Sequence, residues 1–211
     1  MTASPLLIAF DGPAASGKGT LASIIAADYG LPFLDTGLLY RAVGHLAHMR
    51  RIPPAEAGPL ITTALLADDT LRGREAGERA SQAAAIPEVR AALKTYQIAF
   101  AHQASGAVLD GRDIGTVIAP DATVKLFVTA APEVRARRRW LQLTRLDPAL
   151  KFEDVLEDIR IRDARDSGRA HAPLEMAADA LLLDTSDLGI EAAIATARSL
   201  VKSRCGAPAN G

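Results

Sequence analysis

A glycine-rich stretch with one lysine, GPAASGKGT, connects a short apolar run to a helical pattern near the start of the chain. Glycines let the backbone curl so that successive N–H groups face a polyphosphate, and the N-terminus of the next helix adds partial positive charge. Lys18 can place a cation beside the β and γ phosphate oxygens, and Thr20 can bring a hydroxyl group to a magnesium ion. The spacing therefore predicts a site for a nucleoside triphosphate with Mg²⁺. The residues assigned to it are Gly12, Pro13, Ala14, Ala15, Ser16, Gly17, Lys18, Gly19 and Thr20, with Thr20 as the metal ligand.

This stretch departs from the strict GxxxxGK[ST] pattern, because Gly19 separates Lys18 from the hydroxyl residue Thr20. The alternative interpretation is a glycine-rich turn with an exposed lysine and no ligand. A dinucleotide-binding turn is disfavoured, since Gly12 and Gly17 do not form the GxGxxG pattern.

Three further polar segments could bind a second ligand: DTGLLYR at 35–41, DGRD at 110–113 and RDARDSGR at 162–169. The first two follow apolar runs, and parallel α/β sheets bind ligands at the carboxyl ends of their strands. In the third, positions 162, 165, 166 and 169 share one face if the helix continues through all of them. Guanidinium groups match phosphate oxygens in pairs, so arginines around one crevice predict a site for two phosphorylated molecules. The arginines of the run 135–139 are interpreted as a solvated helix face.

These segments must be positioned by the strands and helices between them. Five short, mostly apolar runs are predicted as strands buried on both faces: 6–10, 32–34, 107–109, 124–128 and 181–183. Helical patterns alternate with them at 20–29, 36–49, 89–102, 132–144, 152–166 and 190–202. The alternation predicts an α/β fold with a P-loop NTPase-type parallel five-stranded sheet flanked by helices.

Domain organisation follows from where this alternation breaks. We expect a single domain over 1–211, with its core at 6–50, 89–131 and 180–203. The stretch 51–88 is punctuated by Pro53, Pro54 and Gly58 and is predicted as an insertion. A second, arginine-rich excursion at about 135–169 is predicted as a mobile lid that excludes water.

Composition narrows the function classes. The 24 Lys and Arg residues nearly balance 25 Asp and Glu residues, which argues against a broad nucleic-acid surface. The single Cys205 excludes an intramolecular disulfide and a CxxC-type zinc site. No apolar run approaches the ~18 residues of a membrane span, and the first twelve residues show no basic leader with a cleavage site. We therefore expect a cytoplasmic protein without membrane or nucleic-acid partners.

The motifs GPAASGKGT, DTGLLYR, SQAAAIPEVR, DGRDIGT and RDARDSGRAHAPL occur in this order, and through them the chain resembles the bacterial cytidylate kinases from Leu7 to about Lys202. GKGT is shared by many nucleotide kinases, whereas DGRD with a following TV and the SQ and PxVR elements are much more particular. The resemblance implies an ATP-dependent (d)CMP kinase that moves the γ-phosphoryl group of ATP to CMP or dCMP. It implies Mg²⁺ as cofactor, an NMP-binding insertion at about 51–88 and the arginine-rich lid; we expect a monomer.

The resemblance also assigns roles to individual residues. Four would hold the phosphate of CMP: Thr36, Arg41, Arg112 and Arg169. Three would read the cytosine: Ser81, Arg90 and Asp113. Two would lie near the sugar: Tyr40 and Asp166. The catalytic residues would be Lys18 on the donor phosphates and two lid arginines that close over the transferring phosphoryl group: Arg162 and Arg165.

One difference from the family concerns the insertion. Family members of the common bacterial type have a longer insert with a small sheet, whereas the segment 51–79 is short here, so a trimmed closing lobe is expected. Two alternatives to a CMP kinase remain open: a kinase of UMP or another nucleoside monophosphate, and a P-loop switch protein that binds nucleotide without acting on a small acceptor. The arginines predicted at the strand ends weigh against the switch protein.

Overall fold

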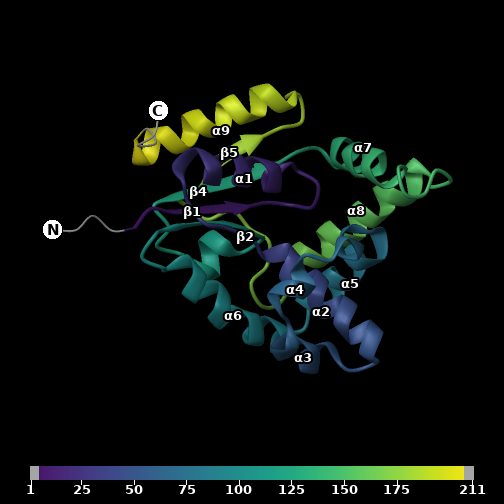
Figure 1. Cartoon of the computed structure of the whole chain (residues 1–211). Helices are drawn as coiled ribbons and strands as arrows, with labels where there is room; N and C mark the ends of the chain where they lie inside the picture. Colours follow the sequence, from purple (N-terminus) through teal and green to yellow (C-terminus); the bar gives the residue numbers. More distant parts are fainter. Residues whose placement is uncertain (1–4, 207–211) are drawn as a thin grey trace.

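The computed structural model describes residues 5–206 and places a five-stranded sheet at the centre of the molecule (Figure 1). The strands are β1 (Leu7–Asp11), β2 (Phe33–Asp35), β3 (Ala107–Asp110), β4 (Val124–Thr129) and β5 (Leu181–Asp184). Their order is β2-β3-β1-β4-β5, and every neighbouring pair runs parallel. The predicted α/β fold with five parallel strands is therefore confirmed.

The register of the sheet brings the polar strand ends together. Asp110 of β3 lies opposite Phe10 of β1 on one side and opposite Asp35 of β2 on the other. Asp11, the last residue of β1, lies opposite Phe127 of β4. The segments that follow β1, β2 and β3 therefore all start at the carboxyl ends of the strands, on the same side of the molecule.

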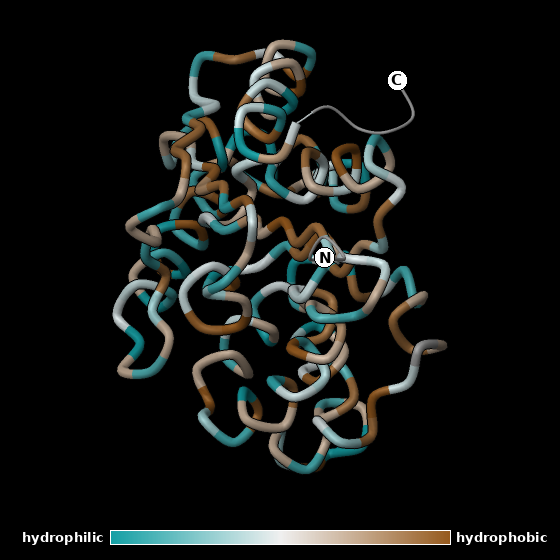
Figure 2. The backbone as a smooth tube through the Cα atoms, turned by 90° about the vertical axis from the view of Figure 1, so that its left-hand side faces the viewer, coloured by the Kyte–Doolittle hydropathy of each residue, from teal (hydrophilic) through white to brown (hydrophobic). Residues whose placement is uncertain are grey.

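Helices cover both faces of the sheet, because each presents an apolar side to the buried strands. On one face lie α1 (Lys18–Tyr29) and α9 (Ile190–Cys205), and their Ile25 and Val201 share an apolar cluster with Leu126 of β4. On the other lie α2 (Thr36–Arg50) and α6 (Pro87–Ala101), whose buried side chains cluster with Leu109 of β3. Figure 2 shows the most hydrophobic stretches of the backbone running through the interior. Within residues 5–206, no helix is both long and apolar enough to cross a bilayer.

Strand β5 differs from its prediction as a strand buried on both faces. Leu183 is buried, but Leu182 is 56% exposed. β5 is an edge strand that pairs with β4 alone, and α9 packs on one of its faces. Alternate side chains of a strand point to opposite faces, so Leu182 faces the uncovered side.

The predicted insertion folds into short helical pieces that lead into a longer helix. The pieces are α3 (Pro54–Ala57), η1 (Gly58–Leu60), α4 (Thr63–Leu66) and η2 (Asp69–Arg72), and they are followed by α5 (Arg74–Ala84). Two of the pieces have an N-cap side chain that accepts a backbone N–H: Thr62 accepts from Leu65 before α4, and Asp68 accepts from Thr70 before η2. Helix α5 crosses α2 closely at Gly44, where a Cβ atom would lie 2.8 Å from the Cβ of Arg79.

Two helices occupy the range predicted for the lid: α7 (Pro132–Leu143) and α8 (Phe152–Ser167). They pack on each other through their own small apolar cluster, which includes Leu143 and Ile159. Trp140 Nε1 donates to the carbonyl oxygen of Leu150 at 2.8 Å and ties the connecting loop to α7. Helix α8 ends at Ser167. The prediction that positions 162, 165, 166 and 169 share one face of a continuous helix therefore fails at Arg169.

Candidate active site

The loop between β1 and α1 has a shape that requires glycine at its start. At Gly12 φ is 143°, and a Cβ atom there would lie 1.9 Å from the carbonyl oxygen of Val128. Gly17, with a φ of 90°, immediately precedes α1. The loop thus leads directly into a helix N-terminus, whose free N–H groups and dipole favour an anion.

A cavity of about 650 Å³ lies beside this loop. Six of the nine residues assigned from the sequence line it, from Ala15 to Thr20, whereas Gly12, Pro13 and Ala14 lie in the loop without lining it. Arg138 of α7 and Thr185 after β5 complete part of the lining. Ser16 Oγ is buried and, in the part of the chain that the structure describes, has no hydrogen-bond partner. The volume and this unused hydroxyl fit a nucleoside triphosphate.

Lys18 is buried in the first turn of α1 and pairs with Asp110 at the end of β3, with 3.4 Å between Nζ and Oδ1. Burial and the positive charge of Arg112 lower the pKa of Lys18 to about 8. Burial raises the pKa of Asp110 to about 6, against the opposing charge of Lys18. The charged form of Lys18 is therefore poorly solvated, and phosphate oxygens would stabilise it.

Oxygen atoms around the first turn of α1 suit a magnesium ion. Thr20 is exposed and lines the large cavity together with Asp35. Asp110 is close, since a Cβ atom at Gly19 would lie 2.9 Å from its Oδ2. Mg²⁺ takes hydroxyl and carboxylate oxygens together with phosphate oxygens and waters, so Thr20, with the two carboxylates nearby, could hold it.

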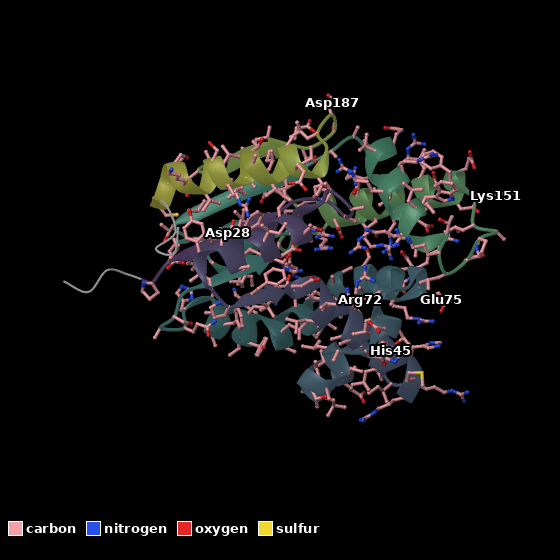
Figure 3. All side chains as sticks on the ribbon, turned by 45° about the horizontal axis from the view of Figure 1, so that its top comes forward. Asp28, His45, Arg72, Glu75, Lys151 and Asp187 are labelled. Carbon is pink, nitrogen blue, oxygen red and sulfur yellow. The ribbon has the colours of Figure 1, made fainter. Side chains whose placement is uncertain are left out.

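A second cavity, of about 30 Å³, lies where α2, α5, the end of β3 and α8 meet. It is lined by eight of the nine residues that the resemblance assigns to the acceptor: Thr36, Tyr40, Ser81, Arg90, Arg112, Asp113, Asp166 and Arg169. Arg162, assigned to catalysis, lines it as well. Residues from 36 to 169 are thus brought together at one point, and Figure 3 shows many side-chain nitrogens (blue) gathered in this part of the molecule.

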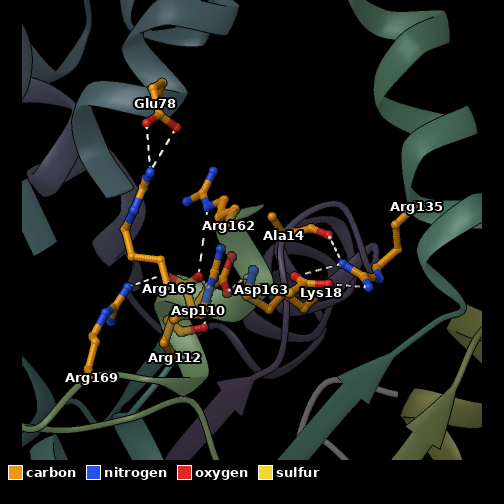
Figure 4. A network of polar contacts seen from close by, with 12 residues as sticks. Ala14, Lys18, Glu78, Asp110, Arg112, Arg135, Arg162, Asp163, Arg165 and Arg169 are labelled. Carbon is orange, nitrogen blue, oxygen red and sulfur yellow. Dashed lines mark hydrogen bonds and ion pairs between the residues drawn. The ribbon is translucent and has the colours of Figure 1, made fainter. Parts of the chain in front are cut away.

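Asp166 is the common partner of the arginines in this acceptor cavity. Its side chain is 1% exposed, and its Oδ2 lies 3.0 Å from Arg112 Nε and 3.8 Å from Arg162 Nε. Arg169 donates to its other oxygen. Burial alone would raise the pKa of Asp166, but the surrounding arginines, Arg112 first, outweigh it and hold the pKa below its usual range. One carboxylate thus balances three guanidinium groups, and the cluster (Figure 4) has capacity for another anion.

At the other end of the acceptor cavity Arg90 forms an ion pair with Asp113. The guanidinium of Arg90 lies 5.9 Å from the centre of the Tyr40 ring, within range of a cation–π contact. Burial raises the pKa of Asp113 despite this partner. Ser81 Oγ is buried without a partner among the described residues. Donor and acceptor groups are therefore held side by side in a confined space, an arrangement that can recognise a polar heterocycle.

Two arginines assigned from the sequence lie outside the acceptor cavity. Arg41 Nη1 donates to the carbonyl oxygen of Leu71 at 2.7 Å, although its guanidinium and that of Arg162 both lie close to Gly77. Arg165 points to α5, where it forms two hydrogen bonds with Glu78, of 3.2 and 2.9 Å. Burial and the positive charge of Arg112 lower the pKa of Arg162 to about 9, so an added anion would stabilise its charged form.

The interpretation of residues 135–139 as a solvated helix face is wrong for three of its arginines. Arg135 is 3% exposed, and it donates to the carbonyl oxygen of Ala14 in the phosphate loop at 3.3 Å and to Asp163 of α8. Arg138 donates to Thr185 Oγ1 at 2.9 Å, beside the large cavity. Arg139 donates to two carbonyl oxygens at the end of η2. The local sequence does not distinguish these arginines from solvated ones, because the partners that bury them include residues far away in the sequence, such as Ala14 and Thr185.

Comparison with known proteins identifies one family. The family described as "Cytidylate kinase" matches residues 8–68 and 61–203. A cytidylate kinase of Azorhizobium caulinodans is 57% identical over 202 residues, which cover 93% of this chain and 98% of that protein. A cytidylate kinase of Xanthobacter autotrophicus is 55% identical over 204 residues, which cover 94% and 98%. Among solved structures, that of a gluconokinase from Sinorhizobium meliloti 1021 superposes with a TM-score of 0.50 at 15% identity, covering 95% of this chain and 94% of the other, and supports the fold alone.

Proposed function

This chain belongs to the cytidylate kinase family and transfers the γ-phosphoryl group of ATP to CMP or dCMP, and from that premise we propose which residues hold each nucleotide and how transfer occurs. The observation that supports the proposal best is the acceptor cavity. Ser81, Arg90 and Asp113 line the same cavity as the arginine cluster around Asp166. Arg112 of that cluster is close enough to Lys18 of the phosphate loop for its charge to lower the pKa of Lys18.

The large cavity binds ATP. The phosphate loop from Gly12 to Thr20 holds the phosphates, with Ala15 to Thr20 lining the cavity. Lys18 contacts the β and γ phosphate oxygens, and Arg138 lies beside the remainder of the nucleotide. Burial lowers the pKa of Lys18 to about 8 because its charged form is poorly solvated, and binding of the polyphosphate would stabilise that charged form. Mg²⁺, held by Thr20 with Asp35 and Asp110 nearby, would neutralise phosphate charge when bound.

The phosphate of CMP binds among the arginines of the acceptor cavity. Arg112 and Arg169, now paired with Asp166, donate to its oxygens. Thr36 Oγ1 donates to the carbonyl oxygen of Asp110 at 2.8 Å and would turn its hydroxyl proton to the phosphate when CMP binds. Arg41 lies within reach beside Arg162, but one of its nitrogens is committed to the carbonyl oxygen of Leu71. Tyr40 and Asp166 lie near the sugar.

Cytosine is read by the polarity of its hydrogen bonds. It offers a 4-amino donor beside acceptors at N3 and O2, which match the carboxylate of Asp113, the guanidinium of Arg90 and the hydroxyl of Ser81. Uracil places an acceptor at O4 and a donor at N3, so the carboxylate and the guanidinium would each face a group of their own kind. Buried polar groups left without partners cost ~1 to 3 kcal/mol each, which disfavours UMP.

Transfer is an in-line displacement at the γ-phosphorus of ATP. An oxygen of the CMP phosphate forms the new bond to phosphorus, and the bond to the oxygen that bridges the β and γ phosphates breaks, giving CDP and ADP. The acceptor is already an oxyanion, so no general base is required. Lys18 and Arg162 stabilise the charge that develops, and Arg165, once released from Glu78, would turn toward the transferring phosphoryl group.

Helix α8 of the lid is joined to α5 by two ion pairs. Arg74 forms two hydrogen bonds with Asp158, of 2.6 and 3.0 Å, in addition to the contact between Arg165 and Glu78. The acceptor cavity has room for about one water, so CMP enters by parting α5 from α8. Closure then excludes water, which would otherwise hydrolyse ATP.

We propose further that the protein works as a cytoplasmic monomer without membrane partners, and that it binds no nucleic acid, since its net charge is close to zero. Size-exclusion chromatography with light scattering tests the monomer.

The acceptor is tested by a coupled assay of ADP release with CMP, dCMP, UMP, AMP and GMP at saturating Mg-ATP. We expect turnover with CMP and dCMP and far less with the other three. Slow ATP hydrolysis that no monophosphate changes would favour a switch protein instead.

A further inference from the structure

We propose that Asp11 is a positioning residue that fixes the cytosine-reading turn of the acceptor site relative to the phosphate loop; the inference rests on the function proposed above. Asp11 is the last residue of β1, and the phosphate loop begins with the next residue, Gly12. Its side chain points away from that loop into the segment that follows β3. There Oδ1 accepts the N–H of Ile114 at 2.8 Å and Oδ2 accepts the N–H of Gly115 at 2.7 Å.

The segment that Asp11 holds is a single wide helical turn, η3 (Ile114–Ile118). The turn is closed by hydrogen bonds from Ile118 N–H to Asp113 O and from Ala119 N–H to Ile114 O. The N–H groups at the start of a helical turn have no partner within it, and Asp11 accepts two of them. Arg112 and Asp113, which bind the phosphate and the base in the proposed function, immediately precede this turn.

Space around the contact supports the same role. A Cβ atom at Gly115 would lie 3.3 Å from Asp11 Oδ2 and 3.1 Å from Lys125 Cδ. Glycine at this position therefore allows the turn to approach the carboxylate closely enough for both hydrogen bonds.

The contact is maintained although it buries a charge. Asp11 is 5% exposed, and burial raises its pKa to about 7. Among the described residues it has no ion-pair partner: the nearby Lys125 donates to Asp179 and to the carbonyl oxygen of Pro120. Burying a carboxylate that has only two N–H partners costs free energy, so the contact contributes little to the stability of the fold. The two acceptor oxygens of one rigid group instead fix the position of the turn that they bind. Asp11 thus leads into the phosphate loop through its main chain and holds η3, the turn after Arg112 and Asp113, through its side chain.

The test is Asp11→Asn, which keeps the shape of the side chain but turns one acceptor oxygen into an NH₂ group that faces an N–H. We expect the KM for CMP to rise about tenfold and the KM for ATP to change by less than about twofold. The ratio of kcat/KM for CMP to that for UMP should fall, because the base-reading residue moves with the turn. Asp121→Asn is the matched control, since Asp121 pairs with His102 on the surface, and it should leave all three values unchanged.

Gly115→Ala places a methyl group against the Asp11 carboxylate and replaces Asp11→Asn as the test if that variant does not fold. We expect the same higher KM for CMP, nearly unchanged KM for ATP and lower preference for CMP over UMP. Unchanged KM and unchanged selectivity in a folded variant would overturn the proposal. So would equal increases in both KM values together with a lower melting temperature, which indicate general destabilisation. Absence of CMP phosphorylation by the unmodified protein, measured first in the same assay, would instead refute the proposed function.

Discussion

Replacing Arg112 by alanine separates binding of the CMP phosphate from binding of the rest of the nucleotide. The Arg112 side chain is 14% exposed and holds Asp166 at 3.0 Å, so in the bound state it donates from a largely buried position. A hydrogen bond to a charged group contributes ~1.5 to 3 kcal/mol, which corresponds to a loss of about 10- to 150-fold in the affinity for CMP. Cytidine has no phosphate, and its affinity should change by less than about threefold.

Isothermal titration calorimetry of CMP and cytidine measures both affinities in the same protein. Arg160→Ala is the matched control on α8, because Arg160 is exposed and pairs with Glu133; it should change neither affinity. Thermal melting shows whether Arg112→Ala is folded. We expect it to be folded, because buried Asp166 still pairs with Arg162 and Arg169. Equal losses for CMP and cytidine would refute the assignment of Arg112 to the phosphate.

Three further predictions concern other parts of the site. Lys18→Ala should abolish turnover in the coupled ADP assay while calorimetry shows nearly unchanged CMP affinity, because Lys18 contacts the donor phosphates; near-normal turnover would contradict the ATP site. Arg138→Ala should raise the KM for ATP several-fold and leave that for CMP unchanged in steady-state kinetics, since Arg138 lines the large cavity and donates to Thr185; an unchanged KM for ATP would exclude this role. Burial raises the pKa of Asp11 from 3.8 to about 7. Between these two pH values the folded protein keeps a proton on Asp11 that the unfolded chain releases, so the contribution of Asp11 to the free energy of unfolding falls as pH rises from about 4 to about 7. Urea denaturation across this range should therefore show Asp11→Asn gaining stability relative to the unmodified protein as pH rises, and a constant difference would refute the raised pKa.

The sheet and the phosphate loop could be predicted from the sequence because their signals are local. Each strand is a short apolar run, and the loop is recognised by the spacing of its glycines and Lys18 between a strand and a helix. The prediction failed at Leu182, because the order of strands, which no local pattern reveals, makes β5 an edge strand.

The arginines of the lid could not be predicted in the same way. Arg135 is buried by contacts with Ala14, 121 residues away, and with Asp163, 28 residues away. The run 135–139 has the composition of a solvated helix face, and only the packing of α7 against the phosphate loop and α8 distinguishes it from one. The role of Asp11 could not be predicted for a related reason. An aspartate that ends a buried strand resembles Asp35 and Asp110, and the two N–H partners of Asp11 lie more than a hundred residues further along the chain.

The central claim, that Asp113 and Arg90 read cytosine, is tested most directly by kcat/KM for CMP and UMP in the unmodified protein and in Asp113→Asn. We predict a preference for CMP on the order of 10² or more in the unmodified protein, because uracil leaves buried polar groups without partners. Asp113→Asn should erode that preference, since an amide presents either a donor or an acceptor to the base. Equal use of UMP and CMP by the unmodified protein would contradict the assignment.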